Sequence, residues 1–178
     1  MSTKPVRRVV TRSGRGIRGR FPSRKLGRMI EWESVLEADA IRLFEFNVSI
    51  ASYHPQPSKE FYHDASGSVR NFVPDFKVTW VQGGSVFIEV KSDADAAYPP
   101  TQRLLGFKAL AMQTQGKDYR VLTPSEIRQE PRFGNLQQLE RHSRHPLSAE
   151  EMQLLESISR DHSYRLKDLA PKLGSEDV

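Results

Sequence analysis

The stretch FVPDFKVTWVQGGSVFIEVK, residues 72–91, decides the fold of this chain. Two runs of alternating apolar and polar residues flank a Gly-Gly pair, which is the pattern of a β-hairpin. The even-numbered positions are apolar in both runs, whereas the odd-numbered positions are mostly polar. Because side chains alternate between the two faces of a strand, both strands share one apolar face only if the loop holds an odd number of residues.

A three-residue loop, Gln82-Gly83-Gly84, meets this condition, and its glycines can take the positive φ that such loops need. This register places Asp75 opposite Lys91, with Glu89 one step along on the same polar face. A two-residue Gly83-Gly84 turn would put Asp75 on the apolar side and bury its charge, so the longer loop is predicted.

The three ionisable side chains on the polar face, Asp75, Glu89 and Lys91, have the chemistry of a metal-dependent phosphodiester hydrolase. Two carboxylates can hold Mg²⁺ or its common substitute Mn²⁺. Such an ion polarises a phosphodiester and lowers the pKa of a bound water. The lysine can orient or help to deprotonate that water and offset charge on phosphorus. The plainer alternative is a surface salt bridge between Asp75 and Lys91.

The sequence around the hairpin predicts an α/β fold: a mixed central sheet with the first helix on one face and the 101–115 helix on the other. The expected domains are a basic arm over 1–28, a nuclease domain over 29–145 and a helical C-terminal segment over 146–178. The expected helices cover 30–46, 101–115, a segment starting at 123–126, 135–144, a segment after the capping box 148–151, and 164–173. The expected strands cover 48–53, 60–63 and 119–122, with a turn over 64–68.

Charge is distributed unevenly along the chain. Residues 1–28 contain ten basic side chains and no acidic one, whereas the remaining residues hold 17 basic and 22 acidic side chains. An arm rich in Arg, Gly and Ser does not fold by itself, but it can neutralise phosphates and release counterions. We therefore expect DNA binding by the arm, the alternative being a solubilising tail. The expected DNA-binding side chains are Arg7, Arg8, Arg12, Arg15, Arg18, Arg20, Arg24 and Lys25.

Composition excludes several other classes of protein. Apolar residues make up 37% of the 178, enough for one main core. The absence of cysteine excludes disulfides, thiolate zinc sites and cysteine nucleophiles, and it fits a reducing cytosol. No apolar run approaches the ~20 residues of a membrane helix, and no apolar stretch follows the basic N-terminus as in a secretory signal. The expected location is the cytoplasm, in association with DNA.

Several short motifs follow one another in an order that resembles a known family. Pro74-Asp75 and Glu89-Val90-Lys91 match the PD-(D/E)xK nuclease signature. Over residues 28–143 the chain resembles the N-terminal catalytic domain of the TnsA family, the endonuclease subunit of heteromeric bacterial transposases. The resemblance rests on residues 33–37, 43–46, 55–57, 73–76, 88–91, 122–128 and 135–136.

This resemblance implies a restriction-endonuclease-like core in which Asp75, Glu89 and Lys91 are catalytic. It also implies that Glu37 from the first helix completes the metal site, with Glu33 as the reserve candidate. Gln102 is a further candidate, for contact with phosphate. Such a subunit cuts the non-transferred strand at transposon ends, beside a DDE transposase and an AAA+ regulator ATPase. The alternatives are a restriction or junction-resolving endonuclease of the same fold, and a non-catalytic DNA-binding subunit.

Overall fold

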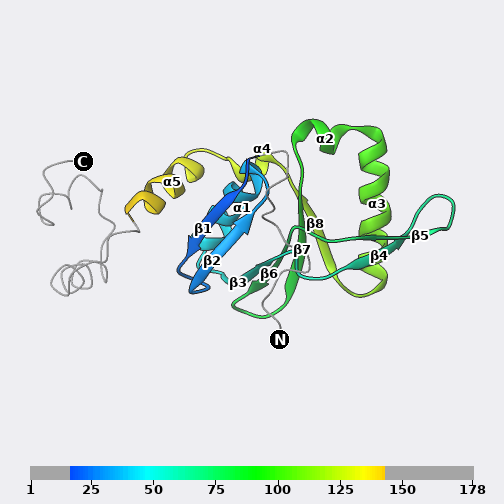
Figure 1. Ribbon diagram of the computed structural model, residues 1–178, viewed down its shortest axis with the longest axis horizontal. Helices are drawn as coiled ribbons and strands as arrows, with labels where there is room; N and C mark the ends of the chain where they lie inside the picture. Colours follow the sequence, from blue (N-terminus) through cyan, green and yellow to red (C-terminus); the bar gives the residue numbers. More distant parts are fainter. Residues whose placement is uncertain (1–16, 143–178) are drawn as a thin grey trace, which may run out of the picture. The chain divides into compact units, whose positions relative to one another are not determined.

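The expected hairpin is formed by β6 (Phe76–Trp80) and β7 (Ser85–Val90) in the computed structural model, which describes residues 17–142 (Figure 1). Within this part of the chain, β6 and β7 are the middle strands of a sheet with the order β3-β6-β7-β8. The β3–β6 and β6–β7 pairs are antiparallel, whereas β7 and β8 are parallel. The described residues therefore form a mixed α/β fold, as the sequence predicts.

The remaining elements complete the described part of the chain. They are β1 (Gly19–Ser23), β2 (Arg28–Trp32), α1 (Val35–Phe46), β3 (Ile50–Pro55), β4 (Glu60–His63), β5 (Val69–Phe72), α2 (Asp93–Ala97), α3 (Pro99–Thr114), β8 (Asp118–Leu122), α4 (Pro124–Ile127) and α5 (Arg132–His142).

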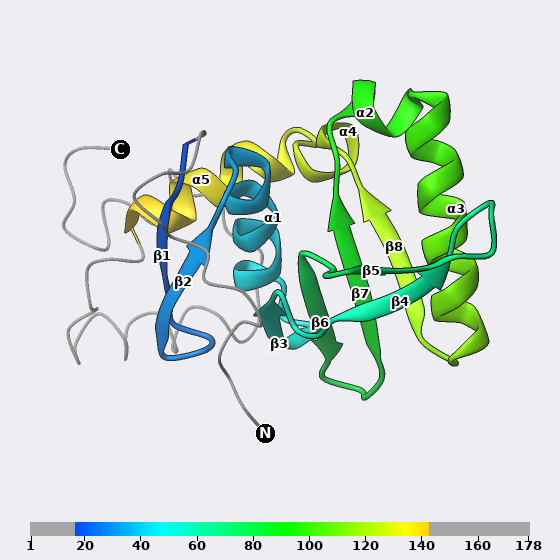
Figure 2. The same cartoon turned by 45° about the vertical axis from the view of Figure 1, so that its right-hand side comes forward.

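The two faces of the sheet bury different side chains. Even-numbered residues such as Phe76, Val78 and Ile88 are almost fully buried against Ile41 and Phe44 of α1. On the other face, Phe87 packs with Phe72 and with Met112 of α3. Figures 1 and 2 show α1 and α3 on opposite sides of the sheet, so the predicted arrangement of these two helices is confirmed.

The register of the hairpin differs from the prediction by two residues. Phe76 pairs with Ile88 and Thr79 with Ser85, so the loop is centred one residue earlier than expected. Trp80 and Gly84 close it, because the Trp80 amide donates to the Gly84 carbonyl at 3.2 Å. The expected pairing of Asp75 with Lys91 is therefore wrong. The faces were predicted correctly, because a shift of two residues leaves every side chain on its own side.

The predicted helix over 30–46 is wrong in its first turn. Residues 28–32 form β2, and α1 begins only after Ser34, whose hydroxyl accepts from the Glu37 amide at 3.1 Å. Because Ser34 caps the helix, the extended chain before it can pair with β1.

Part of the expected basic arm is folded against the sheet domain. β1 and β2 form an antiparallel hairpin in which Phe21 faces Ile30, and both side chains lie in the main core. Gly19 lies so close to Trp32 that a Cβ atom would come within 2.3 Å of that ring. The β1–β2 hairpin thus begins before the expected domain boundary at residue 29.

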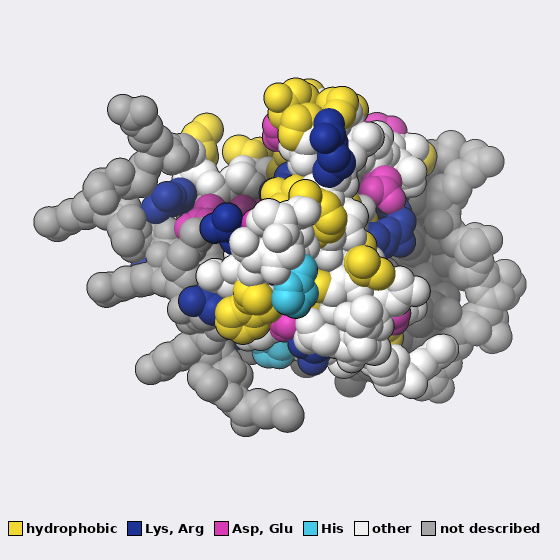
Figure 3. Space-filling model, turned by 90° about the vertical axis from the view of Figure 1, so that its right-hand side faces the viewer, with side chains coloured by type: hydrophobic (Ala, Val, Ile, Leu, Met, Phe, Trp, Pro, Cys, Tyr) yellow, Lys and Arg dark blue, Asp and Glu magenta, His cyan; other side chains and the backbone are white. Residues whose placement is uncertain are grey.

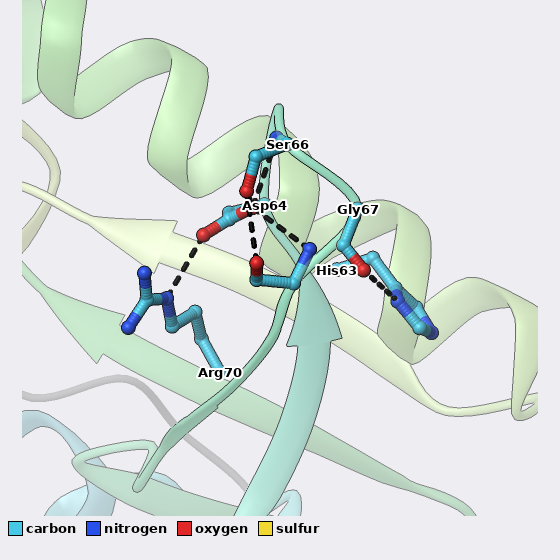
Figure 4. A network of polar contacts seen from close by, with 6 residues as sticks. His63, Asp64, Ser66, Gly67 and Arg70 are labelled. Carbon is cyan, nitrogen blue, oxygen red and sulfur yellow. Dashed lines mark hydrogen bonds and ion pairs between the residues drawn. The ribbon is translucent and has the colours of Figure 1, made fainter.

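A third hairpin, β4–β5, extends past α3 (Figure 1). The turn predicted over 64–68 connects its strands and is confirmed. Asp64 organises the turn: its Oδ1 accepts from the amides of Ser66 and Ser68, and its Oδ2 accepts from Arg70 at 2.8 Å (Figure 4). Gly67, with φ of 78°, allows the tight turn.

The structure confirms the predicted strands over 60–63 and 119–122 and the helix starting at 123–126. It also places a helix over most of 101–115. The strand predicted over 48–53 runs over 50–55, and α2 and β5 were not predicted.

The chain divides into two compact units, Met1–Gln138 and Leu139–Val178. The capping box 148–151 and the helix over 164–173 lie outside the described residues. Among the described helices, none has the length and apolarity to cross a membrane.

Candidate active site

Asp75 lies just before β6, at the end of the buried strand pair. Its Oδ2 accepts a hydrogen bond from the amide of Val90 at 2.7 Å. Burial, together with the negative charges of Glu89 and Glu37, raises the pKa of Asp75 to about 7 against the lowering effect of the Val90 amide and Lys91. A carboxyl group with such a pKa takes up and releases a proton near neutral pH.

Glu89 is 5% exposed and both of its oxygens accept from protein donors. Its Oε1 accepts from the ammonium groups of Lys108 at 2.8 Å and Lys91 at 3.0 Å. Its Oε2 accepts from the Tyr119 hydroxyl at 2.9 Å. Burial alone would raise the pKa of Glu89, but the two lysines outweigh it and hold the pKa below the usual range. Glu89 is therefore an ionised carboxylate with fixed orientation.

Lys91 follows β7 and is the most accessible of the three charged groups, with 31% of its side chain exposed. Its amide donates to the Leu122 carbonyl at 3.0 Å, which extends the parallel pairing of β7 with β8 beyond Val90. Burial would lower the pKa of Lys91, but Glu89, Asp75 and Asp95 together raise it. Lys91 is thus an ammonium donor at neutral pH.

Glu37 lies in the first turn of α1 and participates in the cap of that helix. Its Oε2 accepts from the Glu33 amide at 2.9 Å, and its Oε1 accepts from the Ser34 hydroxyl at 3.2 Å. Glu37 is nevertheless near enough to Asp75 for its charge to raise the pKa of Asp75. This proximity favours Glu37 over Glu33 as a third carboxylate, although its oxygens are occupied by the cap.

The donor chemistry fits a hard divalent cation, but the geometry requires a rearrangement. Asp75 and Glu89 supply carboxylate oxygens on the same sheet face, which is the ligand type that Mg²⁺ and Mn²⁺ prefer. Among the described residues, however, no three His, Cys, Asp or Glu side chains are grouped as a metal site. A cation shared by Asp75 and Glu89 would compete with the two lysines at Glu89 Oε1 or with the Tyr119 hydroxyl at Oε2.

Two residues of the site were missed by the sequence analysis, Lys108 and Tyr119. Lys108 lies on the buried side of α3, one turn before Met112, and its ammonium is 4.7 Å from the centre of the Phe72 ring. Its position four residues before an apolar residue was an available signal, because residues at i and i+4 share a helix face. Gln102, the helix residue that was singled out, is exposed.

The described basic residues differ in what they contact. Arg20 pairs with Glu31 at 3.2 Å on an exposed surface, and Arg24 is exposed in the β1–β2 turn. Lys25 has a structural role, because its ammonium donates to the Phe44 and Asn47 carbonyls at the end of α1. Arg18 is partly buried, and Arg7, Arg8, Arg12 and Arg15 lie outside the described residues.

Among residues 17–142, the basic side chains on the face that carries α3 and the β4–β5 hairpin do not form a continuous surface. Figure 3 shows Lys and Arg side chains on that face separated by hydrophobic and acidic ones. The exposed apolar side chains of these two elements include Phe61, Val69, Leu104 and Leu110.

Comparison of the chain with models of known protein families and with curated proteins gives no match.

Proposed function

We propose that this chain is a metal-dependent DNA endonuclease whose active site consists of Asp75, Glu89 and Lys91, with Mg²⁺ as the cofactor. The observation that carries the proposal is the convergence of a carboxyl group with a pKa near 7, a buried ionised carboxylate and an ammonium donor at the ends of β6 and β7. Burying two carboxylates beside each other does little to stabilise a sheet, so stability alone does not explain this arrangement.

Each residue has a separate role in this proposal. Asp75 and Glu89 hold the cation, and Glu37 completes the set once it leaves the cap of α1. The bound cation supplies Lewis acidity and a water of lowered pKa. Lys91, which is protonated at neutral pH, donates to the phosphodiester oxygens and offsets the charge that develops on phosphorus. Its raised pKa favours this donor role over that of a general base.

The resemblance to the TnsA family supports a narrower proposal. The chain would act as the endonuclease subunit of a transposase, cutting the non-transferred strand at transposon ends with a DDE transposase and an AAA+ ATPase. The basic N-terminal residues would provide contact with DNA phosphates. A transposase gene beside this one would favour transposition, whereas a methyltransferase gene would favour restriction by the same chemistry.

One observation favours the non-catalytic alternative, a DNA-binding subunit. The carboxylate oxygens of Glu89 and Glu37 already have protein donors, so the described carboxylates do not form a ready cation site. The location of bound Mn²⁺ therefore tests the proposal most directly.

Anomalous diffraction from crystals soaked in Mn²⁺ is the decisive measurement. We expect a peak within coordinating distance of Asp75 and Glu89, which Asp75→Asn weakens and Asp118→Asn leaves unchanged. Asp118 is a matched control, because it is an exposed carboxylate opposite Val86, at the far end of the β7–β8 pair. A Mn²⁺-loaded crystal without a peak at Asp75 and Glu89 would support the DNA-binding alternative.

A further inference from the structure

Gln56 directly follows β3 and makes a main-chain hydrogen bond with Asp75. Its amide donates to the Asp75 carbonyl at 2.8 Å, directly after the Pro55–Phe76 pair that ends the β3–β6 ladder. This main-chain hydrogen bond holds Gln56 beside Asp75, at the edge of the proposed site.

The backbone of Gln56 has an unfavourable conformation. Its φ is 45°, and among the described residues 17–142 it is the one non-glycine residue with a positive φ. Glycine adopts this conformation without a steric penalty, whereas a side chain with a Cβ atom does not. Pro55 and Pro57 on either side further restrict the backbone.

The side chain of Gln56 is also unfavourable for stability. The residue is 7% exposed, and its Oε1 is fully buried without a hydrogen-bond partner in the described part of the protein. A buried acceptor without a donor loses its hydration and gains nothing in return. An apolar side chain would avoid this cost and a glycine would avoid both costs, so stability does not explain a glutamine at this position.

We propose that Gln56 is a positioning residue of the site: its side-chain oxygen accepts a hydrogen bond from a water molecule bound to the cation that Asp75 and Glu89 hold. This inference rests on the proposed function. The cation and its water then supply the donor that Oε1 lacks, and strained residues that persist next to a reactive centre commonly serve it. The buried amide fixes the water relative to Asp75 and thereby strengthens cation binding.

The test compares the full-length Gln56→Leu, Gln56→Gly and Gln56→Glu variants with the wild-type protein. Gln56→Leu removes the acceptor at similar size, Gln56→Gly also removes the backbone strain, and Gln56→Glu keeps an acceptor oxygen. For each variant, Mn²⁺ affinity is measured by electron paramagnetic resonance titration, and the melting temperature is measured in EDTA.

We expect the Leu and Gly variants to bind Mn²⁺ at least fivefold more weakly while melting at the same temperature as the wild type or higher. Gln56→Glu should bind Mn²⁺ at least as tightly as the wild type. If the Leu variant fails to fold, the Gly variant decides the outcome, because it removes strain rather than adding bulk.

Two results would overturn the inference alone: unchanged Mn²⁺ affinity in the Leu and Gly variants, or a clear loss of metal-free stability in both, which would make Gln56 a purely structural residue. If the wild-type protein itself binds no Mn²⁺ at Asp75 and Glu89, the proposed function fails and this inference fails with it. The wild-type titration therefore separates the two failures.

Discussion

Asp75 illustrates at the scale of a single residue how a site can be unfavourable for stability. Its carboxyl group accepts one amide hydrogen bond but is largely removed from water and is near Glu89 and Glu37. These surroundings disfavour the ionised form, so the pKa rises from 3.8 to about 7. In the absence of metal, the folded protein therefore binds a proton more tightly than the unfolded chain does.

This pKa difference predicts the effect of Asp75→Asn on stability at different pH values. The stability associated with the raised pKa is fully present below pH 3.8 and is lost as the pH rises through about 7. The variant keeps an oxygen for the Val90 amide, so its free energy of unfolding should match that of the wild type near pH 4. At pH 8 its free energy of unfolding should exceed that of the wild type by up to ~4 kcal/mol. Urea unfolding in EDTA measures the difference, and a gap that does not widen with pH would contradict the raised pKa.

Lys108 and Glu89 form a buried ion pair, and its loss affects the free energy of unfolding more than the loss of a surface ion pair does. Both side chains are more than nine-tenths buried, and their charged atoms are 2.8 Å apart. Removing the lysine leaves Glu89 with Lys91 and Tyr119 in a site with little water. Breaking a buried pair in this way typically costs ~3–5 kcal/mol, whereas breaking an exposed pair costs below ~1 kcal/mol.

We therefore predict that Lys108→Met lowers the free energy of unfolding by about 3 kcal/mol. Arg20→Met is the control, because it breaks the exposed pair with Glu31 and should change stability by less than ~1 kcal/mol. In the double variant Lys108→Met/Glu89→Gln, most of the loss should be recovered, because the buried charge is gone. If the single and double variants lost the same free energy of unfolding, Lys108 would contribute to stability through packing alone.

At the scale of the element, Glu45 connects α1 to two separate strands. Its carboxylate accepts from the Ser23 hydroxyl and the Arg24 and Lys25 amides in the β1–β2 hairpin, and from the Tyr53 hydroxyl of β3. Burial would raise the pKa of Glu45, but these donors lower it below 4.5. The last turn of α1 thus holds the β1–β2 hairpin against the domain.

Glu45→Gln should lower the free energy of unfolding by about 1–3 kcal/mol at pH 7, because its amide nitrogen cannot accept the hydrogen bonds of Ser23 and Tyr53. A lowered pKa contributes stability above pH 4.5, and this contribution is lost as the pH falls through the folded-state value. The gap between variant and wild type should consequently narrow at pH 3. Denaturant unfolding at both pH values measures it, and a constant gap would mean that charge plays no part.

The elements also show what the sequence could and could not predict. Alternation along residues 76–90 determines which side chains share a face, and the structure has these faces as predicted. It does not determine the register, because every odd loop length preserves the alternation; the loop closed by Trp80 and Gly84 is decided by local turn geometry. Likewise, Ile30 fits the helical spacing of α1, but pairing with Phe21 places it in a strand.

The candidate site was predictable only in the part that one hairpin brings together. Asp75, Glu89 and Lys91 are close in sequence, so strand alternation is sufficient to place them on one face. Lys108 and Tyr119 reach Glu89 from α3 and β8, and Gln56, directly after β3, donates its main-chain amide to the Asp75 carbonyl. Such contacts depend on the tertiary arrangement, which local patterns do not encode.

At the scale of the whole molecule, the proposal separates DNA affinity from cleavage. The strongly basic residues that precede the first strand are distinct from the charged groups around Asp75. Each phosphate that a basic side chain neutralises contributes about 0.9 to the salt dependence of binding.

Replacing Arg7, Arg8, Arg12 and Arg15 by Ala should weaken DNA binding and reduce the slope of log affinity against log salt by about 3–4. Lys91→Ala should leave affinity and slope nearly unchanged while abolishing cleavage. Fluorescence anisotropy with duplex DNA over a series of KCl concentrations measures both variants. An unchanged slope in the fourfold variant would exclude the arm as the main phosphate contact.

The parallel pairing of β7 with β8 has a consequence for the order in which the protein folds. The β6–β7 hairpin closes through a short loop, whereas β8 can join β7 only after α2 and α3 have crossed between them. Contacts between distant segments form more slowly than local ones, and a chain emerges from the ribosome N-terminus first. Glu89 is therefore synthesised before Lys108 and Tyr119, and its carboxylate lacks these two hydrogen-bond partners until α3 and β8 have been made.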